Sequence, residues 1–429
     1  MRHRSLGALL GSLVLVVAVA FAPAAAAQSV TPSPPFTTPD TSSCPYREAP
    51  PPARDASEVP APGVRAPARL SRPAVPVGGA QLGRCGVVVP VGAPAVPGGI
   101  SAASWVLADL DSGEVLAAKD PHGLYRPAST LKVLTSLLVL RTLPLDRVLV
   151  GTQADAEAEG SAVGVGPGGR YTVKTLMTGL LLQSGNDAAH ALAVAMGGVD
   201  TTVAAMNTLA TSLGAQDTRA ATPSGLDGPG QSTSAYDLAL LFRAALAKPA
   251  FAALVSTTRA TFPGYGTRPA FVIANDDQLL YSYPGALGGK PGFTDDARQT
   301  FVGAAERGGR RLVVALMDGE RTPLIPVAQA GALLSWGFAL NDGVAPVGRL
   351  VTGPPSVASP STAATPTPAA TPTQSPAPVV LAQAHVVSTG RSAAGMLGLA
   401  ALVLAAALTV VLVALVVVTA LDSRRYRRR

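Results

Sequence analysis

A serine and a lysine three residues apart are the side chains in this sequence best suited to nucleophilic catalysis. Ser129 and Lys132 lie at the start of an apolar run that predicts a buried helix over 131–140. At this spacing both side chains leave the same face of a helix. The serine N–H can donate to an oxyanion, and a neutral lysine one turn on can accept the hydroxyl proton. Such a lysine is neutral only if it is desolvated or lies near a second cation. A serine and a lysine at this spacing also occur on ordinary amphipathic helices, so the pair alone does not establish a site.

Two later motifs provide the groups that would complete such a site. The segment QSGND has small residues at a sharp turn, which can present the Ser184 hydroxyl and the Asn186 amide to a cleft. The segment GGKPGFT at 288–294 comes just before an expected strand at 299–305. A strand edge there would supply Lys290 as the second cation and a backbone with which an extended peptide can pair.

Other chemistry-bearing patterns are excluded by their context. The run GVGPGG at 164–169 matches a dinucleotide-binding fingerprint, but no strand precedes it and no helix follows, so we predict a loop. No histidine has a partner at metal-ligand spacing among His3, His122, His190 and His385. We therefore expect no metal and no cofactor.

The elements that must position these groups form one domain over 99–348. Apolar periodicity predicts strands at 104–110, 299–305 and 311–317, and helices at 131–140, 173–182, 187–196, 202–213, 234–247 and 327–339. Lys248 and Pro249 are expected to end the helix at 234–247. Strands at both ends with helices between them predict an α/β or α+β fold whose sheet joins distant parts of the chain.

The charge distribution excludes nucleic acid as the main partner. The chain has 429 residues and a formal net charge of +7. The tail at 422–429 holds five arginines and one acid, and Arg2 and Arg4 add two further positive charges. The body between them is almost neutral, so it has no basic surface that would hold phosphates.

Two apolar segments predict export and anchoring. Residues 1–27 have a basic start, an apolar stretch and three alanines before Gln28, which is typical of a signal peptide, with an uncleaved anchor as the alternative. Residues 395–421 carry no charge and, as a helix of about 40 Å, would cross a bilayer. The basic tail at 422–429 would remain in the cytoplasm. We therefore expect a single-pass protein of the cell membrane with its catalytic domain outside.

Two segments flank the predicted domain. Residues 28–98 are rich in proline and contain both cysteines, Cys44 and Cys85, which in an oxidising compartment most simply form one disulfide. The sequence leaves open whether this segment packs on the domain. Residues 349–394 are rich in Pro, Thr, Ser and Ala, which predicts an extended stalk between domain and membrane.

The order SxxK, SxN and KxG resembles the penicillin-binding and serine β-lactamase superfamily. The surrounding text is similar to the serine D-alanyl-D-alanine carboxypeptidases, the low-molecular-mass penicillin-binding proteins of peptidase family S11. It comprises LLLQSGNDAA at 180–189, MN at 206–207, SGLD at 224–227 and STSAYDLA at 232–239. The resemblance covers about 101–340 and implies an antiparallel sheet flanked by helices, with a helical subdomain.

The resemblance also implies roles for the motif residues. Ser129 would form the acyl-enzyme with Lys132 as its base, and Ser184 would relay a proton to the leaving D-alanine. Asn186 would hold the peptide carbonyl, and Lys290 would lower the pKa of Lys132 and attract the substrate carboxylate.

The strand after Lys290 would bind the substrate. The N–H groups of Ser129 and Phe293 would form the oxyanion hole, and Gly292 and Thr294 belong to the same binding strand. The implied partners are peptidoglycan stem peptides that end in D-Ala-D-Ala, and β-lactams as covalent inhibitors.

The sequence departs from the family pattern at two positions. Pro291 stands where the family has a threonine whose hydroxyl is expected to bond the terminal carboxylate. Losing one charge-assisted hydrogen bond costs about 1.5–3 kcal/mol, roughly tenfold to 150-fold in rate or binding. Thr294 is a partial substitute, although strand alternation points it to the opposite face. Arg298 stands where the family usually has glycine.

Three other interpretations remain at this stage. Pro291 motivates an attenuated or non-catalytic relative that binds the cell wall or β-lactams. A secreted β-lactamase would need a second base, and no Glu-x-x-Leu-Asn lies between Ser184 and Lys290. The third is a globular ectodomain in which the motifs coincide by chance.

Overall fold

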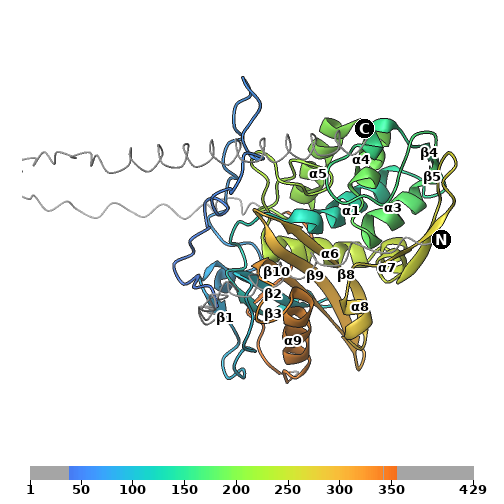
Figure 1. The fold of residues 1–429 in the computed structure, drawn as a ribbon. Helices are drawn as coiled ribbons and strands as arrows, with labels where there is room; N and C mark the ends of the chain where they lie inside the picture. Colours follow the sequence, from blue (N-terminus) through green and yellow to red (C-terminus); the bar gives the residue numbers. More distant parts are fainter. Residues whose placement is uncertain (1–37, 342, 355–429) are drawn as a thin grey trace, which may run out of the picture. The chain divides into compact units, whose positions relative to one another are not determined.

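An antiparallel sheet of seven strands forms the centre of the molecule. The computed structural model describes residues 38–341 and 343–354, so the expected signal peptide, membrane span and basic tail, and most of the stalk, lie outside the described residues. The strand order is β1-β3-β2-β10-β9-β8, and β11 also pairs with β3 (Figure 1). The strands are β1 (Val87–Val88), β2 (Ser104–Asp109), β3 (Glu114–Lys119), β8 (Ala286–Thr294), β9 (Arg298–Arg307), β10 (Arg310–Gly319) and β11 (Gly348–Arg349).

Helices cover both faces of this sheet. One face carries α9 (Pro326–Phe338) with the short α8 (Leu279–Ser282) (Figure 1). The other face carries α6 (Ala235–Leu246) and α7 (Pro249–Val255), beyond which lies a helical subdomain. The subdomain contains α1 (Lys132–Thr142), α2 (Gln153–Ala156), α3 (Val173–Leu182), α4 (Asn186–Ala195) and α5 (Val199–Leu213).

The alternation of side chains along β10 explains the two cores. Leu312, Val314 and Leu316 join the apolar cluster under α9, which also contains Trp105 and Leu333. The residues between them, Val313, Ala315 and Met317, join the larger cluster on the side of α6. A strand buried on both faces in this way shows a continuous apolar run, as 312–317 does.

Two small hairpins complete the fold. One joins β4 (Val148–Val150) to β5 (Arg170–Thr172), and the other joins β6 (Arg259–Phe262) to β7 (Phe271–Ala274). In the described part of the chain no single helix is long and apolar enough to span a bilayer, although the bent pairs α4 with α5 and α6 with α7 meet the length and composition criteria.

The predicted helices and strands are confirmed to within a few residues, with two differences in detail. The helix expected from residue 131 begins as a 3-10 turn, η2 (Ala128–Leu131), before α1. Pro249 does end α6, but it also opens α7 at the first helical position, where its fixed φ suits a helix start. The prediction of a plain helix end at Pro249 was therefore incomplete.

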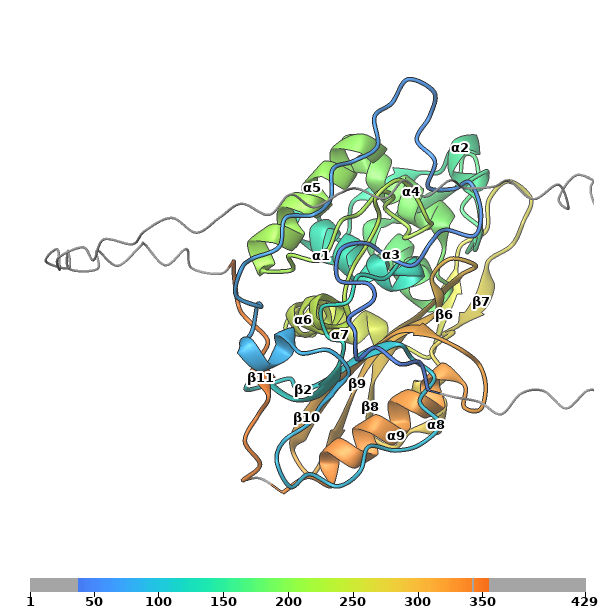
Figure 2. The ribbon, with the colours of Figure 1, turned by 90° about the vertical axis from the view of Figure 1, so that its left-hand side faces the viewer.

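The N-terminal segment packs on the domain instead of standing free. Its strand β1 pairs with β3, with Val87 opposite Lys119 and Val88 opposite Ala118. Cys44 and Cys85 form a disulfide that ties the first part of the described segment to the turn before β1. Figure 2 shows the coil of this segment, in blue, on the face turned to the viewer.

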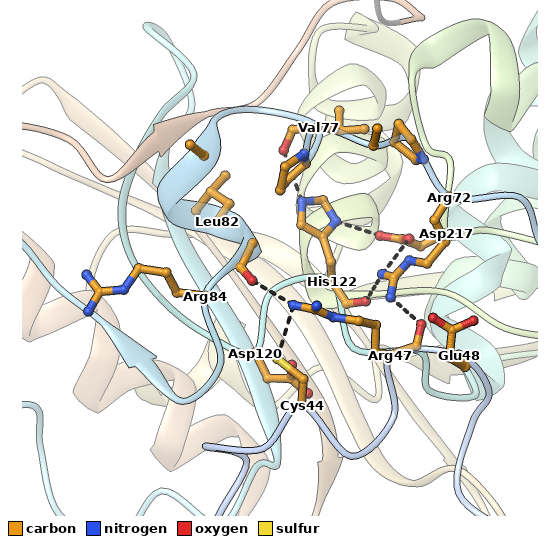
Figure 3. Close-up of a pocket in the computed structure, with 15 residues that line it drawn as sticks. Cys44, Arg47, Glu48, Arg72, Val77, Leu82, Arg84, Asp120, His122 and Asp217 are labelled. Carbon is orange, nitrogen blue, oxygen red and sulfur yellow. Dashed lines mark hydrogen bonds and ion pairs between the residues drawn. The ribbon is translucent and has the colours of Figure 1, made fainter. Parts of the chain in front are cut away.

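A buried charged cluster fastens this segment to the domain (Figure 3). The His122 ring lies 2.6 Å from Asp217 Oδ2 through Nδ1 and 3.0 Å from the Val77 carbonyl oxygen through Nε2. Arg72 donates to Asp217 Oδ1 at 3.2 Å and to the carbonyl oxygens of Arg47 and His122. Both ring nitrogens face acceptors, so the ring donates twice as an imidazolium.

The same region contains a cavity of about 350 Å³ between the segment and the domain. Its lining includes Arg47, Arg72, His122 and Asp217, and it includes none of the motif residues. Arg72 and His122 are occupied by contacts within the protein, so we assign this cavity to the packing of the segment and not to catalysis.

We predict that His122→Gln lowers the free energy of unfolding by about 2–4 kcal/mol at pH 6, because it leaves Asp217 without its main buried partner. Burial lowers the pKa of His122, but the Asp217 carboxylate and its hydrogen bond outweigh burial and raise it. The imidazolium therefore stabilises the fold fully below the unfolded pKa of about 6.5, and this contribution is lost as pH rises through the folded pKa. Urea unfolding of the wild type and the variant at pH 6 and pH 9 measures this contribution. A difference in free energy of unfolding between the two proteins that is as large at pH 9 as at pH 6 would contradict the prediction.

Candidate active site

Ser129 lies on a short turn whose start is held by two other hydroxyls. The Pro127 carbonyl accepts from Thr130 Oγ1 at 2.6 Å and from Thr300 Oγ1, on β9, at 2.9 Å. Ala128 has a φ of 48°, in the left-handed region that residues with a Cβ avoid. This kink costs on the order of 1–3 kcal/mol and turns the half-buried Ser129 to the rim of the sheet.

Lys132 has no exposed surface and three polar neighbours. Its Nζ lies 2.7 Å from Asn186 Oδ1, 2.7 Å from the Ser224 carbonyl oxygen and 2.9 Å from Ser129 Oγ. The first two oxygens can only accept, whereas the serine hydroxyl can also donate. A neutral amine has two N–H groups and one lone pair, so it satisfies all three when Ser129 donates to Nζ. This is the arrangement of a nucleophile and its general base.

The electrostatics of the cleft favour this neutral amine. Burial lowers the pKa of Lys132 well below 10.5, the Lys290 ammonium lowers it further, and Asp187 opposes both. Lys290 is also fully buried, and burial lowers its pKa to about 8, against the attraction of Asp276 and Asp277. Lys290 has the two carboxylates and Lys132 does not, so the first proton leaves Lys132.

Ser184 and Asn186 come from the turn between α3 and α4. Ser184 has a φ of 58°, and Gly185 is the N-cap of α4. Both ends of the Asn186 amide are held: Oδ1 accepts from Lys132, and Nδ2 donates one of its two protons to the Glu159 carbonyl oxygen at 2.6 Å. The buried Ser184 Oγ has no hydrogen-bond partner among the described residues. A buried hydroxyl without a partner is costly and suits a group that bonds to a ligand.

Asp187 holds the neighbouring glycine loop against α4. Its carboxylate accepts from the N–H groups of Val163, Gly164 and Val165 at 2.7–3.0 Å. The run at 164–169 is a loop, as predicted, and it belongs to the scaffold of the SxN turn.

Strand β8 provides the opposite wall and lies at the edge of the sheet. Gly292 is needed for its close approach: a Cβ there would lie 2.9 Å from the Ser129 nitrogen and 2.4 Å from Thr300 Oγ1. Phe293 follows with a side chain that is 52% exposed. Backbone nitrogens two residues apart point to the same edge of a strand, so the Phe293 N–H and the Pro291 nitrogen point the same way. The structure thus brings Ser129 and β8 together at one point.

The two departures from the family pattern differ in what they change. Pro291 sits opposite Phe301, and its carbonyl accepts from Lys290 Nζ at 3.0 Å. Thr294 lies at the β8–β9 turn, where its Oγ1 accepts from the Ala297 N–H at 2.9 Å. Arg298 has a φ of 55°, which explains why glycine is usual there, and it makes a bidentate ion pair with Glu320.

Sequence reasoning missed three contributors to this site. The Ser224 carbonyl is a backbone group, so no residue type reveals it. Asp276 and Asp277 are close to Lys290 only in the folded chain, although two adjacent acids after a strand gave a weak signal.

Within the described residues no group of three His, Cys, Asp or Glu side chains could hold a metal.

Comparisons with known proteins agree with this geometry. Residues 91–321, more than half of the chain, match the family model described as D-alanyl-D-alanine carboxypeptidase. The chain is 52% identical over 258 residues to "D-alanyl-D-alanine carboxypeptidase DacB2" of Mycobacterium tuberculosis, which covers 59% of this chain and 88% of that protein. It is 36% identical over 255 residues to DacD of Salmonella typhimurium, covering 56% of this chain and 64% of the relative.

Solved structures give the same result. A D-alanyl-D-alanine carboxypeptidase structure from Mycobacterium tuberculosis aligns with a TM-score of 0.58 at 50% identity, over 61% of this chain and 99% of the other. The DD-transpeptidase of Streptomyces K15 aligns with a TM-score of 0.54 at 28% identity, over 58% of this chain and 100% of the other. The fold, the three motifs and these matches show that the chain belongs to the D-alanyl-D-alanine carboxypeptidase family, peptidase family S11.

Proposed function

We propose that this protein removes the terminal D-alanine from peptidoglycan stem peptides through an acyl-enzyme on Ser129. The enzyme class, a serine-type D-Ala-D-Ala carboxypeptidase, follows from the family. The observation that carries the mechanism is the 2.9 Å contact between Lys132 Nζ and Ser129 Oγ, in a place where burial and Lys290 keep the amine neutral.

In the acylation step, Ser129 Oγ attacks the carbonyl carbon of the penultimate D-alanine, and its proton moves to Lys132 Nζ. The new oxyanion accepts from the N–H groups of Ser129 and Phe293. When the C–N bond breaks, the leaving nitrogen takes a proton from Lys132 through the Ser184 hydroxyl, whose oxygen has no other partner in the described residues. Free D-alanine and a Ser129 ester result.

In the second step, water attacks this ester. Lys132 is neutral again after the first step, so it can accept the water proton and return it to Ser129 Oγ. The β-lactam ring presents a similar carbonyl, but its leaving nitrogen remains attached to the acyl group. We therefore expect β-lactams to form long-lived adducts on Ser129.

Substrate binding rests on β8 and Lys290. The edge strand offers main-chain groups to an extended peptide, and the Lys290 ammonium attracts the terminal carboxylate. Asn186 contacts the peptide beside Lys132, and Gly292 allows the close approach of the strand.

We also propose that the chain is anchored in the cell membrane by 395–421, with the catalytic domain on the outer, cell-wall side. The support is the charge-free stretch followed by five arginines and the proline-rich stalk before it. In membrane fractions, the full chain should pellet and a chain ending at residue 394 should not. Equal recovery of both chains from the soluble fraction would contradict the anchor.

One observation favours a second candidate, an attenuated or non-catalytic relative that binds wall peptides or β-lactams. Pro291 offers neither a hydroxyl nor an N–H at the edge where the terminal carboxylate would bind. In this case acylation by penicillin would be normal and release of D-alanine negligible.

Release of D-alanine from a soluble pentapeptide that ends in D-Ala-D-Ala separates these functions. We expect the segment 28–393 to release D-alanine and the Ser129→Ala variant to release none, because the nucleophile is gone. Pro291→Thr should increase the rate by about tenfold or more, the value of one charge-assisted hydrogen bond. No release by the wild type beside normal penicillin labelling, with release restored in Pro291→Thr, would establish the attenuated relative.

The pH dependence of acylation follows from the two lysines. The rate should fall toward low pH as Lys132 gains a proton, and fall above about pH 8 as Lys290 loses one. Without its charge, Lys290 no longer lowers the pKa of Lys132 and no longer attracts the substrate carboxylate. The second-order rate constant for a fluorescent penicillin, measured from pH 5 to 10, tests this bell shape. A rate that is flat between pH 8 and 10 would show that Lys290 keeps its proton or that its charge is not needed.

A further inference from the structure

The N-terminal segment contacts the residues on both sides of the oxyanion hole. On one side is Arg126, three residues before Ser129, whose side chain is only 2% exposed. Both carboxylate oxygens of Glu58 accept from its guanidinium, Oε1 from Nε and Oε2 from Nη2 at 2.8 Å. Its Nη1 donates to the Pro51 carbonyl oxygen at 2.8 Å. Two residues of the N-terminal segment thus accept all three hydrogen bonds that this arginine makes among the described residues.

On the other side is Asp296, three residues after Phe293 in the β8–β9 turn. Its side chain is buried, and Oδ1 accepts from the Arg54 N–H at 2.5 Å. Residues 51–58 therefore hold the chain just before one oxyanion donor and just after the other. Figure 2 shows the coil that contains them on the face turned to the viewer.

The two oxyanion donors need an external support of this kind. Ser129 sits on a four-residue 3-10 turn that begins with a left-handed alanine, and Phe293 sits near the end of an edge strand. They belong to elements far apart in sequence, joined at this point by the packing of Gly292 on Ser129. Oxyanion donors act only if their spacing is held to a fraction of an ångström.

The segment is itself anchored near both ends of this contact. Before it, the Tyr46 carbonyl accepts from the Leu124 N–H at 2.8 Å, and Cys44, two residues earlier, is disulfide-bonded to Cys85. After it, Pro67 lies against Gly230. The match to the family model begins only at residue 91, so 51–58 lie outside the part that this chain shares with the model.

We propose that residues 51–58 brace the oxyanion hole and that Glu58 is a positioning residue for acylation, acting through Arg126. The proposal rests on the proposed function, since it assigns a role within that reaction. Glu58 does not contact the substrate in this role; it fixes the turn from which Ser129 attacks.

The test compares Glu58→Gln with the wild type as full chains in detergent, with all rates normalised to the sites that penicillin labels at long times. We expect kcat for D-alanine release and the rate constant of penicillin acylation both to fall by roughly tenfold, with KM for the peptide unchanged. Both reactions use the same oxyanion hole, so both should fall together. Glu48→Gln is the matched control, because Glu48 is an exposed residue of the same coil outside 51–58, and it should leave both rates unchanged.

Three results would overturn the brace. They are unchanged rates in Glu58→Gln, an equal loss in Glu48→Gln, or a rise in KM for the peptide with normal penicillin acylation. The last would make the segment a wall of the substrate cleft. Penicillin acylation tests the brace even if the wild type releases no D-alanine, so failure of the peptidase function and failure of the brace are distinguishable.

Discussion

Lys132 and Lys290 have no exposed surface and act on each other's charge, and the rest of the site depends on this conflict. A buried ammonium is costly, and two that interact are costlier still, so one must lose its proton. Asp276 and Asp277 are close to Lys290, while Lys132 is surrounded by an amide oxygen, a carbonyl oxygen and a hydroxyl. Two carboxylates act on Lys290 and one, Asp187, acts on Lys132, so the placement of the carboxylates favours Lys132 as the neutral amine.

This constraint also explains the strained backbone around the cleft. Each group that reaches Lys132 comes from a different turn, and two of those turns contain a residue with a Cβ at positive φ, Ala128 and Ser184. Such residues cost on the order of 1–3 kcal/mol each and persist only where packing holds them. Here the packing comes from Gly225, whose Cβ, if present, would lie 1.9 Å from the Ala128 carbonyl oxygen, and from Gly292 on Ser129. The glycines of the motifs therefore allow close approach between walls, while the polar residues provide the chemistry.

The sequence predicted those parts of the molecule whose residues show a local pattern, such as apolar periodicity or the spacing of a motif. Periodicity identified α3, α6, β9 and β10, since these elements bury apolar side chains at regular intervals. The spacing of Ser129 and Lys132 predicted a nucleophile with its base, and the structure places Lys132 Nζ 2.9 Å from Ser129 Oγ. The N-terminal segment had no such signal. Glu58 and Arg72 attach its coil to the domain by hydrogen bonds and ion pairs, and its buried apolar residues Val77, Leu82 and Val88 show no regular spacing. The Ser224 carbonyl and the acids near Lys290 depend on long-range folding, which residue types alone do not encode.

The two departures from the family pattern show that the effect of a substitution on the fold and its effect on the chemistry are separate questions. At Arg298 the change affects backbone conformation: the left-handed φ costs free energy, and the bidentate pair with Glu320 offsets part of it. At Pro291 the backbone is already suited to proline, since β8 is an edge strand whose outer side makes no sheet bonds. Proline therefore fits this edge strand, and we expect its effect to fall on the free edge that a peptide would use, in recognition and not in folding.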